Sequence, residues 1–416
     1  MKRVLGWPHG GGALSDIPPD RRILVTLPDT PWPVDGGKRL RCNSVLRGLA
    51  ASGLVDVAVL FTTSSADGPP VPPDVEVARW LRLSPPPLGR WTGAVASVAR
   101  RLPVQVGAPR WDVVRERLAT WMAKEYDLVW FGGLDHAWQL RGLLQAPHRI
   151  VDCDDVETVK WRAYLDAGGG DRLERVQRRV ELPLWGRLQN DVVRWADAVA
   201  VCSDLDAQRL GTTRAVVVPN TYPEPVGVPA ATPRVPDPQA PRLLMIANWA
   251  TEQNVDSASF AAAEVLPEVR RRMPGARLRL VGRSPERIAE LAAVDGVDLI
   301  GPVDDVAAEL ADADVVVVPM RFGGGTRLKI IEAFAHGVPV VSTALGAEGL
   351  NALDGVHLLL RDRPDEFAAA VQTVVTDSDL RARVADAGRE LYRASFRPDA
   401  TVAAVTGLVD RLVPRG

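Results

Sequence analysis

The stretch from Asp314 to Gly349 contains the residues whose types and spacing are best suited to chemistry. It reads DVVVVPMRFGGGTRLKIIEAFAHGVPVVSTALGAEG, with three glycines and a threonine followed closely by two cations. Glycines have no side chains, so a ligand can approach the main-chain N–H groups. A glycine-rich turn that leads into a helix N-terminus also favours anions, because free N–H groups and the helix dipole both face the ligand. The stretch therefore predicts a phosphate site.

The elements that must position this site are a strand, a turn and a helix. Residues 315–318 are all valine, a pattern typical of a strand that is buried on both faces. Thr326 is suited to the N-cap of the following helix, and Gly337 to its C-terminus. The turn between strand and helix contains the glycines at 323–325.

Glu332 is the carboxylate of the predicted helix. On a wheel of about 100° per residue it lies about 40° from Leu328, beside an apolar stripe that includes Ile331. A carboxylate next to a buried stripe needs a partner, and two interpretations remain open. Glu332 forms an ion pair with Lys329, three residues before it. Alternatively, it accepts hydrogen bonds from ligand hydroxyls at the edge of the sheet, where open α/β folds bind their ligands. Both can hold together.

Length and composition limit the class of protein. The chain has 416 residues, enough for about two or three domains with their own cores. Its net charge of -2 argues against general binding of nucleic acid. The cysteines and histidines show no spacing typical of a disulfide framework or a zinc site, so a reducing cytoplasm is the expected compartment. No apolar run approaches the roughly 20 residues needed to span a bilayer.

Strand patterns alternate with helical patterns in both halves of the chain, which predicts doubly wound parallel sheets of the α/β class. We expect a loose leader at 1–20 and a first Rossmann-like domain at 21–218. The closely spaced prolines of 219–241 predict a stiff linker. A second Rossmann-like domain follows at 242–395, and a terminal helix at 396–416.

Arginines alternate with tryptophans from Val77 to Trp111, and this stretch contains no acidic residue. The combination is typical of a surface that binds anionic lipid or a lipid-linked acceptor. The alternative is a solvated arginine face with the tryptophans in the core. No recognition motif for nucleic acid accompanies these residues.

The segment RFGGGTRLKIIEAFAHGVPVVST, residues 321–343, resembles the C-terminal signature of family 4 glycosyltransferases of the GT-B fold. The resemblance implies two doubly wound Rossmann-like domains that face each other across a cleft. The N-terminal domain would bind the acceptor and the C-terminal domain the nucleotide sugar, with the terminal helix crossing back. In the family, two glutamates separated by seven residues contact the sugar and the ribose. Glu332 matches the second and Gly324 stands at the first, so this chain resembles the GGGTRLK variant.

The resemblance also implies where the charge for the phosphates comes from. Many members of the family neutralise the diphosphate with an arginine and a lysine after the first strand of the second domain, where this chain has Asn248 and Gln253. A diphosphate that enters a dry site without compensating charge is costly. We therefore expect Arg327 and Lys329 to supply that charge. Arg283 either assists them or is an ordinary surface arginine.

The residues expected to take part in the transfer are Glu332, Arg327, Lys329 and His136. The expected donor contacts come from glycine turns, from strand ends of the second domain and from the turn before the helix: Gly36, Gly37, Asn248, Gly282, Arg283, Phe322, Gly323, Gly324, Gly325 and Thr326. Two of these predictions have a plain alternative. Gly36 and Gly37 also suit a tight turn, and His136 also suits a buried structural position.

The resemblance implies a hexosyltransferase that moves a sugar from a nucleoside diphosphate sugar to an acceptor hydroxyl with retention of the anomeric configuration. In the family's usual mechanism the leaving phosphate takes the acceptor proton, so neither a metal nor a cofactor is expected. The expected acceptor is lipid-linked or a small molecule, and the expected location is the cytoplasm, at the inner face of the membrane. Two rivals stay open: a nucleotide-sugar epimerase of the same fold, and a non-catalytic nucleotide-sugar binding protein.

Overall fold

The protein forms two compact units in a computed structural model, which describes residues 21–34, 36–60, 71–85, 90–225, 235–324 and 327–415. Within these residues, the N-terminal unit consists of 21–162, 171–221 and 398–415, and the C-terminal unit of 163–170 and 222–397. The sequence places 163–170 in the first domain and 219–221 in the linker. Residues 163–170 instead pack within the C-terminal unit, and 219–221 within the N-terminal unit.

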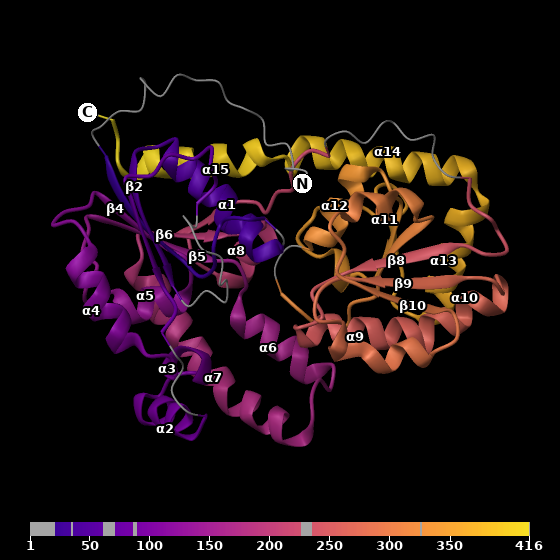
Figure 1. The fold of residues 1–416 in the computed structure, drawn as a ribbon, viewed down its shortest axis with the longest axis horizontal. Helices are drawn as coiled ribbons and strands as arrows, with labels where there is room; N and C mark the ends of the chain where they lie inside the picture. Colours follow the sequence, from indigo (N-terminus) through magenta and orange to yellow (C-terminus); the bar gives the residue numbers. More distant parts are fainter. Residues whose placement is uncertain are drawn as a thin grey trace. The chain divides into compact units, whose positions relative to one another are not determined.

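The N-terminal unit is built on a seven-stranded parallel sheet with the order β3-β2-β1-β4-β5-β6-β7 (Figure 1). Its strands are β1 Arg22–Leu27, β2 Leu54–Leu60, β3 Arg79–Leu83, β4 Leu128–Phe131, β5 His148–Cys153, β6 Ala198–Val201 and β7 Ala215–Val217. Its helices are α1 Gly37–Ala50, α2 Arg90–Arg100, α3 Val104–Gly107, α4 Trp111–Trp121, α5 Leu134–Leu140, α7 Arg172–Trp195, α8 Asp204–Leu210 and α15 Pro398–Leu412. Helix α6, Glu157–Asp166, begins in this unit, and its residues from 163 onward belong to the C-terminal unit. The near-continuous apolar runs of the central strands are typical of a sheet that is covered on both faces.

Strand β3 is not predicted by the sequence, because it lies in the stretch of arginines and tryptophans that begins at Val77. It pairs in parallel with β2, and Arg79 forms an ion pair with the buried Asp56 at 2.5 Å. Trp80, the next residue, is exposed. An edge strand of this kind needs few apolar residues, which explains why its pattern is weak.

The C-terminal unit is built on a six-stranded parallel sheet with the order β10-β9-β8-β11-β12-β13. Its strands are β8 Arg242–Ile246, β9 Arg277–Val281, β10 Val297–Gly301, β11 Val315–Val318, β12 Val340–Ser342 and β13 Leu359–Leu360. Its helices are α9 Glu252–Phe260, continued by a π-helical turn at Ala261–Val265 and by α10 Leu266–Arg272, then α11 Val306–Asp312, α12 Leu328–His336, α13 Pro364–Thr376 and α14 Ser378–Ser395. Short 3₁₀ segments lie at Pro285–Ala293 and Leu345–Ala347.

Both sheets have a topological switch point, because the chain leaves the central strand first toward one edge and later toward the other. β1 lies between β2 and β4, and β8 lies between β9 and β11. This arrangement confirms the two doubly wound Rossmann-like sheets predicted from the sequence. Ligands of open α/β sheets bind outside the carboxyl ends of the strands at such a point. The loops after β8 and β11 are therefore the first place to look for a site.

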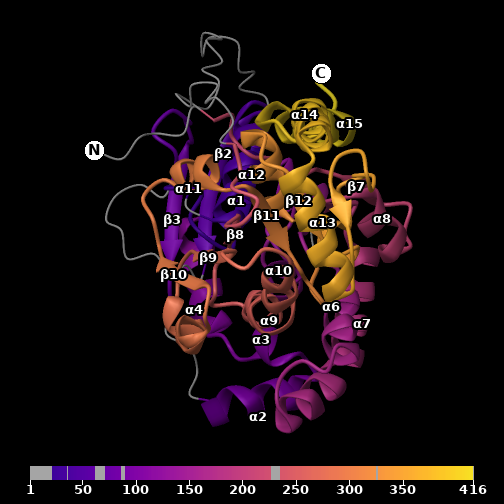
Figure 2. The ribbon, with the colours of Figure 1, turned by 90° about the vertical axis from the view of Figure 1, so that its right-hand side faces the viewer.

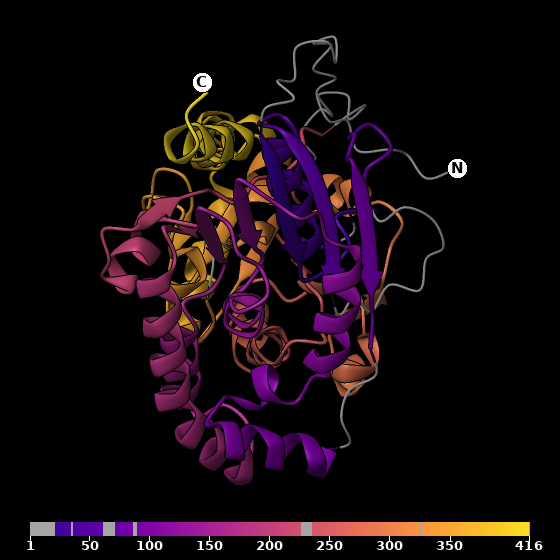
Figure 3. The same cartoon turned by 90° about the vertical axis from the view of Figure 1, so that its left-hand side faces the viewer.

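The two halves of helix α7 differ in how far they are packed into the N-terminal unit. Its second half is packed into the unit through Trp185, Leu188 and Val192. Its first half and α2 lie at the same end of the N-terminal unit (Figures 2 and 3). The Oε1 atom of Glu181 accepts a hydrogen bond from the Val104 N–H at 3.4 Å, which ties α7 to α3.

The last helix, α15, completes the core of the N-terminal unit against α1. Val405 and Leu408 of α15 are fully buried in a cluster with Val45 and Leu49 of α1. Gly48 makes this close approach possible, because a Cβ at that position would lie 2.5 Å from Val405 Cβ and 3.3 Å from the Val402 carbonyl oxygen.

We expect Gly48→Ala to lower the free energy of unfolding by about 1 to 3 kcal/mol, because the two helices must move apart to admit a methyl group. Gly407→Ala is the matched control on α15, since a Cβ there would meet nothing within 4 Å. That control should be neutral or stabilising by up to about 1 kcal/mol, through helix propensity. Chemical denaturation of the full chain measures both. Equal stabilities for the two variants would contradict this packing.

Candidate functional site

The loops after β8 and β11 lie next to each other, because these strands pair in parallel with Leu243 opposite Val315. The first loop leads into α9 and the second into α12. Helix α12 begins at Leu328, with Arg327 at the N-cap position, and ends at the left-handed Gly337 (φ 68°). The predicted helix end at Gly337 is confirmed. The start lies one residue later than an N-cap at Thr326 would give.

The first turn of α12 carries a cation, Lys329, that contacts the start of α9. Lys329 Nζ donates a hydrogen bond to Asn254 Oδ1 at 2.8 Å, and Asn254 Nδ2 donates to the Asn248 carbonyl oxygen at 2.8 Å. The pKa of Lys329 is lowered to about 7, chiefly because the ammonium is desolvated and also because Arg327 is nearby. This first turn contains no acidic residue. The protein thus holds Lys329 at a cost that a bound anion would remove.

Gly323 brings the main chain of the second loop close to the side chains of Gln253 and Arg327. Its φ is 145°, and a Cβ there would lie 3.1 Å from Gln253 Oε1 and 3.2 Å from an Arg327 guanidinium nitrogen. Arg327 also donates a hydrogen bond to the Gly324 carbonyl oxygen. The structure therefore brings together Gln253, Arg327, Gly323 and Gly324. The predicted donor contacts Gly325 and Thr326 lie outside the described residues.

Gly282 and Arg283, at the end of β9, support the loop after β8. Gly282 has φ 145°, and a Cβ there would lie 1.7 Å from the Ala247 carbonyl oxygen, so glycine is required at this close approach. The Arg283 carbonyl oxygen accepts a hydrogen bond from the Trp249 N–H at 2.9 Å, and the Arg283 side chain is exposed. The main chain of Gly282 and Arg283 therefore positions the segment that contains Asn248.

Phe322, one of the predicted donor contacts, is buried in the C-terminal unit. Its ring meets Tyr164 edge-on, with 5.0 Å between the ring centroids. Tyr164 belongs to the 163–170 segment, which explains in part why this segment packs with the C-terminal unit. The side chain of Phe322 thus anchors the start of the glycine turn.

Glu332 has a partner that the sequence does not reveal. The phenol of Tyr222 donates a hydrogen bond to its carboxylate, and the ring of Tyr222 contacts His336 edge-on. Desolvation raises the pKa of Glu332 to about 7, although the Tyr222 hydrogen bond lowers it. Between these described residues no Glu332–Lys329 ion pair is recorded, since Lys329 bonds to Asn254 instead. Of the two interpretations of Glu332, the local ion pair is therefore wrong. Tyr222 was hidden in the predicted linker, where its neighbours give no pattern.

The three site residues predicted in the first half of the chain belong to the N-terminal unit. Gly36 is the N-cap of α1 with an extended backbone, and Gly37 is the first residue of that helix. His136 is buried on α5, where its Nδ1 lies 3.0 Å from Thr26 Oγ1 and its ring meets Trp111 edge-on. Burial lowers the pKa of His136, which favours the neutral ring.

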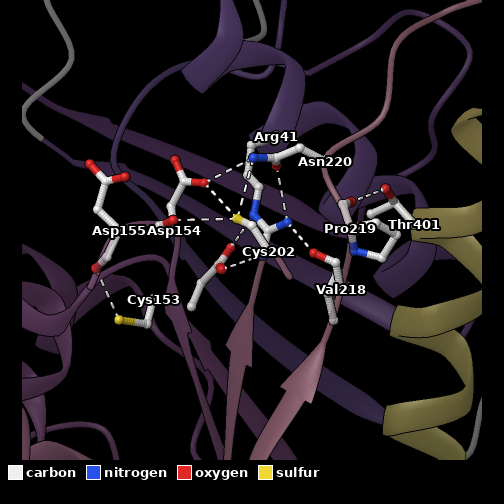
Figure 4. A network of polar contacts seen from close by, with 10 residues as sticks. Arg41, Cys153, Asp154, Asp155, Cys202, Val218, Pro219, Asn220 and Thr401 are labelled. Carbon is white, nitrogen blue, oxygen red and sulfur yellow. Dashed lines mark hydrogen bonds and ion pairs between the residues drawn. The ribbon is translucent and has the colours of Figure 1, made fainter. Parts of the chain in front are cut away.

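The carboxylates at the end of β5 take part in a network of polar contacts with other side chains of the N-terminal unit (Figure 4). Asp152 accepts two hydrogen bonds from the guanidinium of Arg41, at 3.2 and 2.6 Å. Asp154 Oδ1 accepts hydrogen bonds from Cys202 Sγ at 2.9 Å and Asn220 Nδ2 at 3.1 Å. Within the described part of the chain, no group of His, Cys, Asp and Glu is arranged to hold a metal ion.

The arginines of the Val77–Trp111 stretch are largely held by their own unit. Arg79 pairs with Asp56, Arg110 pairs with Asp112 at 2.9 Å, and Arg100 donates to the Gly107 carbonyl oxygen at 3.2 Å. These contacts favour the alternative of a solvated arginine face. Of the tryptophans, Trp111 lies in the core as that alternative expects, whereas Trp80 is exposed. Within the described residues, none of the helices combines the length and the apolar character that crossing a bilayer requires.

A family of known proteins matches the part of the chain that contains α12. Residues 240–377 match the family described as Glycosyl transferases group 1, and this range includes β8, β11 and α12. The resemblance to glycosyltransferases predicted from the segment 321–343 is thereby confirmed.

Two relatives match this chain over about a third of its length. A GDP-mannose-dependent alpha-(1-6)-phosphatidylinositol monomannoside mannosyltransferase of Mycobacterium tuberculosis is 34% identical over 154 residues, which is 33% of this chain and 40% of that protein. An exopolysaccharide phosphotransferase of Streptomyces coelicolor is 29% identical over 152 residues, which is 35% of this chain and 16% of that protein. The matches thus span less than half the length of either relative.

The fold extends further than the sequence match. The solved structure of a sucrose-phosphate synthase from Thermosynechococcus elongatus superimposes with a TM-score of 0.69 at 20% identity, over 94% of this chain and 99% of that chain. Likeness at this identity establishes the fold alone. The chain has the two Rossmann-like domains of the GT-B glycosyltransferase fold, as the sequence predicts.

We expect Glu332→Gln to raise the free energy of unfolding of the ligand-free protein by about 1 to 3 kcal/mol at pH 8. The pKa of Glu332 is raised to about 7 in the folded state, so the folded chain binds more protons than the unfolded chain between about pH 4.5 and 7. Glu332 therefore destabilises the folded chain, and this destabilisation grows as the pH rises through this window. The gain from the variant should be full above pH 7 and vanish near pH 4.5.

Denaturant unfolding across this pH range measures the difference between variant and parent. The exposed Glu290, replaced by Gln, is the control in the same unit and should give a small difference that does not change with pH. A Glu332→Gln variant that is less stable than the parent at pH 8 would contradict the desolvated position of this carboxylate.

Proposed function

We propose that the chain is a retaining glycosyltransferase that moves a hexosyl group from a nucleoside diphosphate sugar to an acceptor hydroxyl. The observation that carries the proposal is the desolvated Lys329 beside Arg327, at the N-terminus of α12 and at the switch point between β8 and β11. Such a cluster in a glycosyl transferases group 1 domain suits the diphosphate of the donor.

The diphosphate would bind where three favourable terms coincide. The N–H groups at the start of α12 and the helix dipole attract negative charge. Lys329 and Arg327 supply charge-assisted hydrogen bonds, which are stronger than neutral ones. The side-chain amide of Gln253, whose Oε1 faces Gly323, would contribute its neutral N–H groups as donors. Because the pKa of Lys329 is near 7 without a ligand, binding of a phosphate near neutral pH would draw a proton onto its amine.

Glu332 would bind the sugar–nucleotide part of the donor through hydroxyl groups. It lies one turn after Lys329 on α12, so both side chains belong to the same end of the helix. A hydroxyl that donates to its carboxylate stabilises the charged form and would lower its raised pKa. Glu332 is thus a donor-binding residue, and the proposal gives it no role as a nucleophile.

The chemistry asked of these residues is stabilisation of the leaving diphosphate. Fixed cations and helix N–H groups counter the charge that develops as the bond to the sugar breaks. The departing phosphate oxygen would take the acceptor proton, so the proposal requires no side-chain base, metal or cofactor. One relative is named for GDP-mannose and a phosphatidylinositol monomannoside, which supports a nucleoside diphosphate donor and a lipid-linked acceptor. We place the reaction in the cytoplasm, at the inner face of the membrane.

We expect Lys329→Gln to weaken binding of a nucleoside diphosphate by about 10- to 100-fold, the range for loss of one charge-assisted hydrogen bond. Titration calorimetry at pH 7 measures the affinity. Arg363→Gln is the matched control, because Arg363 is an exposed cation in the same unit that pairs with Asp365 at 3.1 Å. Equal affinities for the parent and both variants would place the diphosphate elsewhere.

Turnover separates the proposed reaction from its rivals. A thermal-shift screen first selects the nucleoside diphosphate, since a ligand at 100 times its Kd stabilises by about 2.7 kcal/mol. Proton NMR then follows the matching sugar donor. A product with the donor's anomeric configuration, formed only with an acceptor, is expected. Conversion of the donor alone would identify an epimerase. Binding without turnover against any acceptor would favour a non-catalytic binding protein.

A further inference from the structure

The first half of α7 exposes an apolar stripe toward solvent. Leu173, Val176 and Val180 follow one another three and four residues apart, and 74%, 50% and 65% of their respective surfaces are exposed. Residues at this spacing lie on one face of a helix. Solvated helix faces are ordinarily polar, so three branched aliphatic side chains in a row indicate a contact surface.

The stripe is bordered by arginines, and the carboxylates of this half of α7 lie elsewhere. Arg172 and Arg179 are exposed and stand seven residues apart, on one flank of the stripe. Glu174 and Glu181 lie on another face, where Arg178 pairs with them at 3.6 and 3.0 Å. The outward face of this half-helix is therefore apolar and cationic, although the chain as a whole has a net charge of -2.

The inner side of the same half-helix is already occupied within its unit. The guanidinium of Arg178 stacks on the ring of Trp161, with 3.8 Å to the centroid. Helix α2, which lies at the same end of the unit, adds to the outer surface (Figures 2 and 3). It exposes 75% of Val98, followed by the exposed Arg100 and Arg101.

We propose that this end of the N-terminal unit docks on the surface of an anionic lipid bilayer. Helices with an apolar stripe beside basic side chains lie in the headgroup region, with the stripe toward the acyl chains. Arginine side chains extend along such a stripe and place the guanidinium at the lipid phosphates. A bilayer surface can meet α7 and α2 together, and its negative potential matches the exposed arginines. This docking surface is distinct from the arginines that pair with Asp56 and Asp112, and it does not depend on the proposed reaction.

Co-sedimentation of the full chain with vesicles tests the proposal. Vesicles of phosphatidylcholine and phosphatidylglycerol in equal parts should bind the protein, and vesicles of phosphatidylcholine alone should bind it weakly. Serine at Leu173, Val176 and Val180 together should lower the partition coefficient by about tenfold or more, since burial of each aliphatic side chain is lost. Arg172→Gln with Arg179→Gln should weaken binding and reduce its dependence on salt.

The control is serine at Leu353 and Val356, two exposed apolar residues of the C-terminal unit (60% and 45% exposed), and it should bind as the parent does. Thermal melting verifies that the variants stay folded. Equal partition of the triple variant and the parent would overturn the proposal, as would absence of binding to the mixed vesicles. A dimer in solution that the triple variant dissolves, without vesicle binding, would assign the stripe to contact between copies of the chain and would also overturn it.

Discussion

A lysine that has lost part of its hydration at the start of a helix is the feature on which the site of the C-terminal unit depends. Lys329 stands where the helix dipole disfavours a cation, and Arg327 beside it adds like-charge repulsion. Asn254 provides a dipole in compensation and not a full charge. A protein that holds a cation in this way has most to gain from an anion of the right shape. The unfavourable free energy of desolvating the Lys329 ammonium would be offset by the bound anion, and this contributes to the affinity.

The same helix holds a carboxylate whose situation is the reverse. The pKa of Glu332 is raised and that of Lys329 is lowered, both to about 7, although the residues lie three positions apart. A direct ion pair would have favoured the charged form of both groups. Separate neutral partners, Tyr222 for the glutamate and Asn254 for the lysine, leave each group open to a ligand. A molecule with a phosphate and a hydroxyl suits this pair, and a nucleoside diphosphate sugar carries both.

The sequence predicts the fold well wherever the signal is local. The run of four valines at 315–318 indicates a buried strand, and Gly337 ends the following helix because glycine readily adopts the left-handed conformation. Arg327 and Lys329 can also be recognised in the sequence as a cationic pair, because they stand at the start of a predicted helix. Strand β3 escapes detection because an edge strand needs few apolar residues.

What the sequence cannot supply are partners that are remote in the chain. Tyr222 donates to Glu332 from a segment that reads as a linker, and Asn254 contacts Lys329 from the first turn of α9. Tyr164 packs on Phe322, which lies far from it in the sequence, so the unit to which 163–170 belongs could not be assigned from a local pattern. The ion pair expected between neighbours on α12 fails for the same reason. Local spacing permits it, but the tertiary contacts give each residue a different partner.

Titration of the Lys329 amine tests the account most directly. Lysine is present at five positions of the chain, so ¹³C-dimethylation gives few NMR signals, and Lys329→Gln identifies the one of interest. In the free protein this amine should titrate near pH 7, and saturation with a nucleoside diphosphate should raise its pKa by about one unit or more. An amine that titrates near its ordinary value of about 10.4 in the free protein, or that does not respond to the nucleotide, would contradict the account.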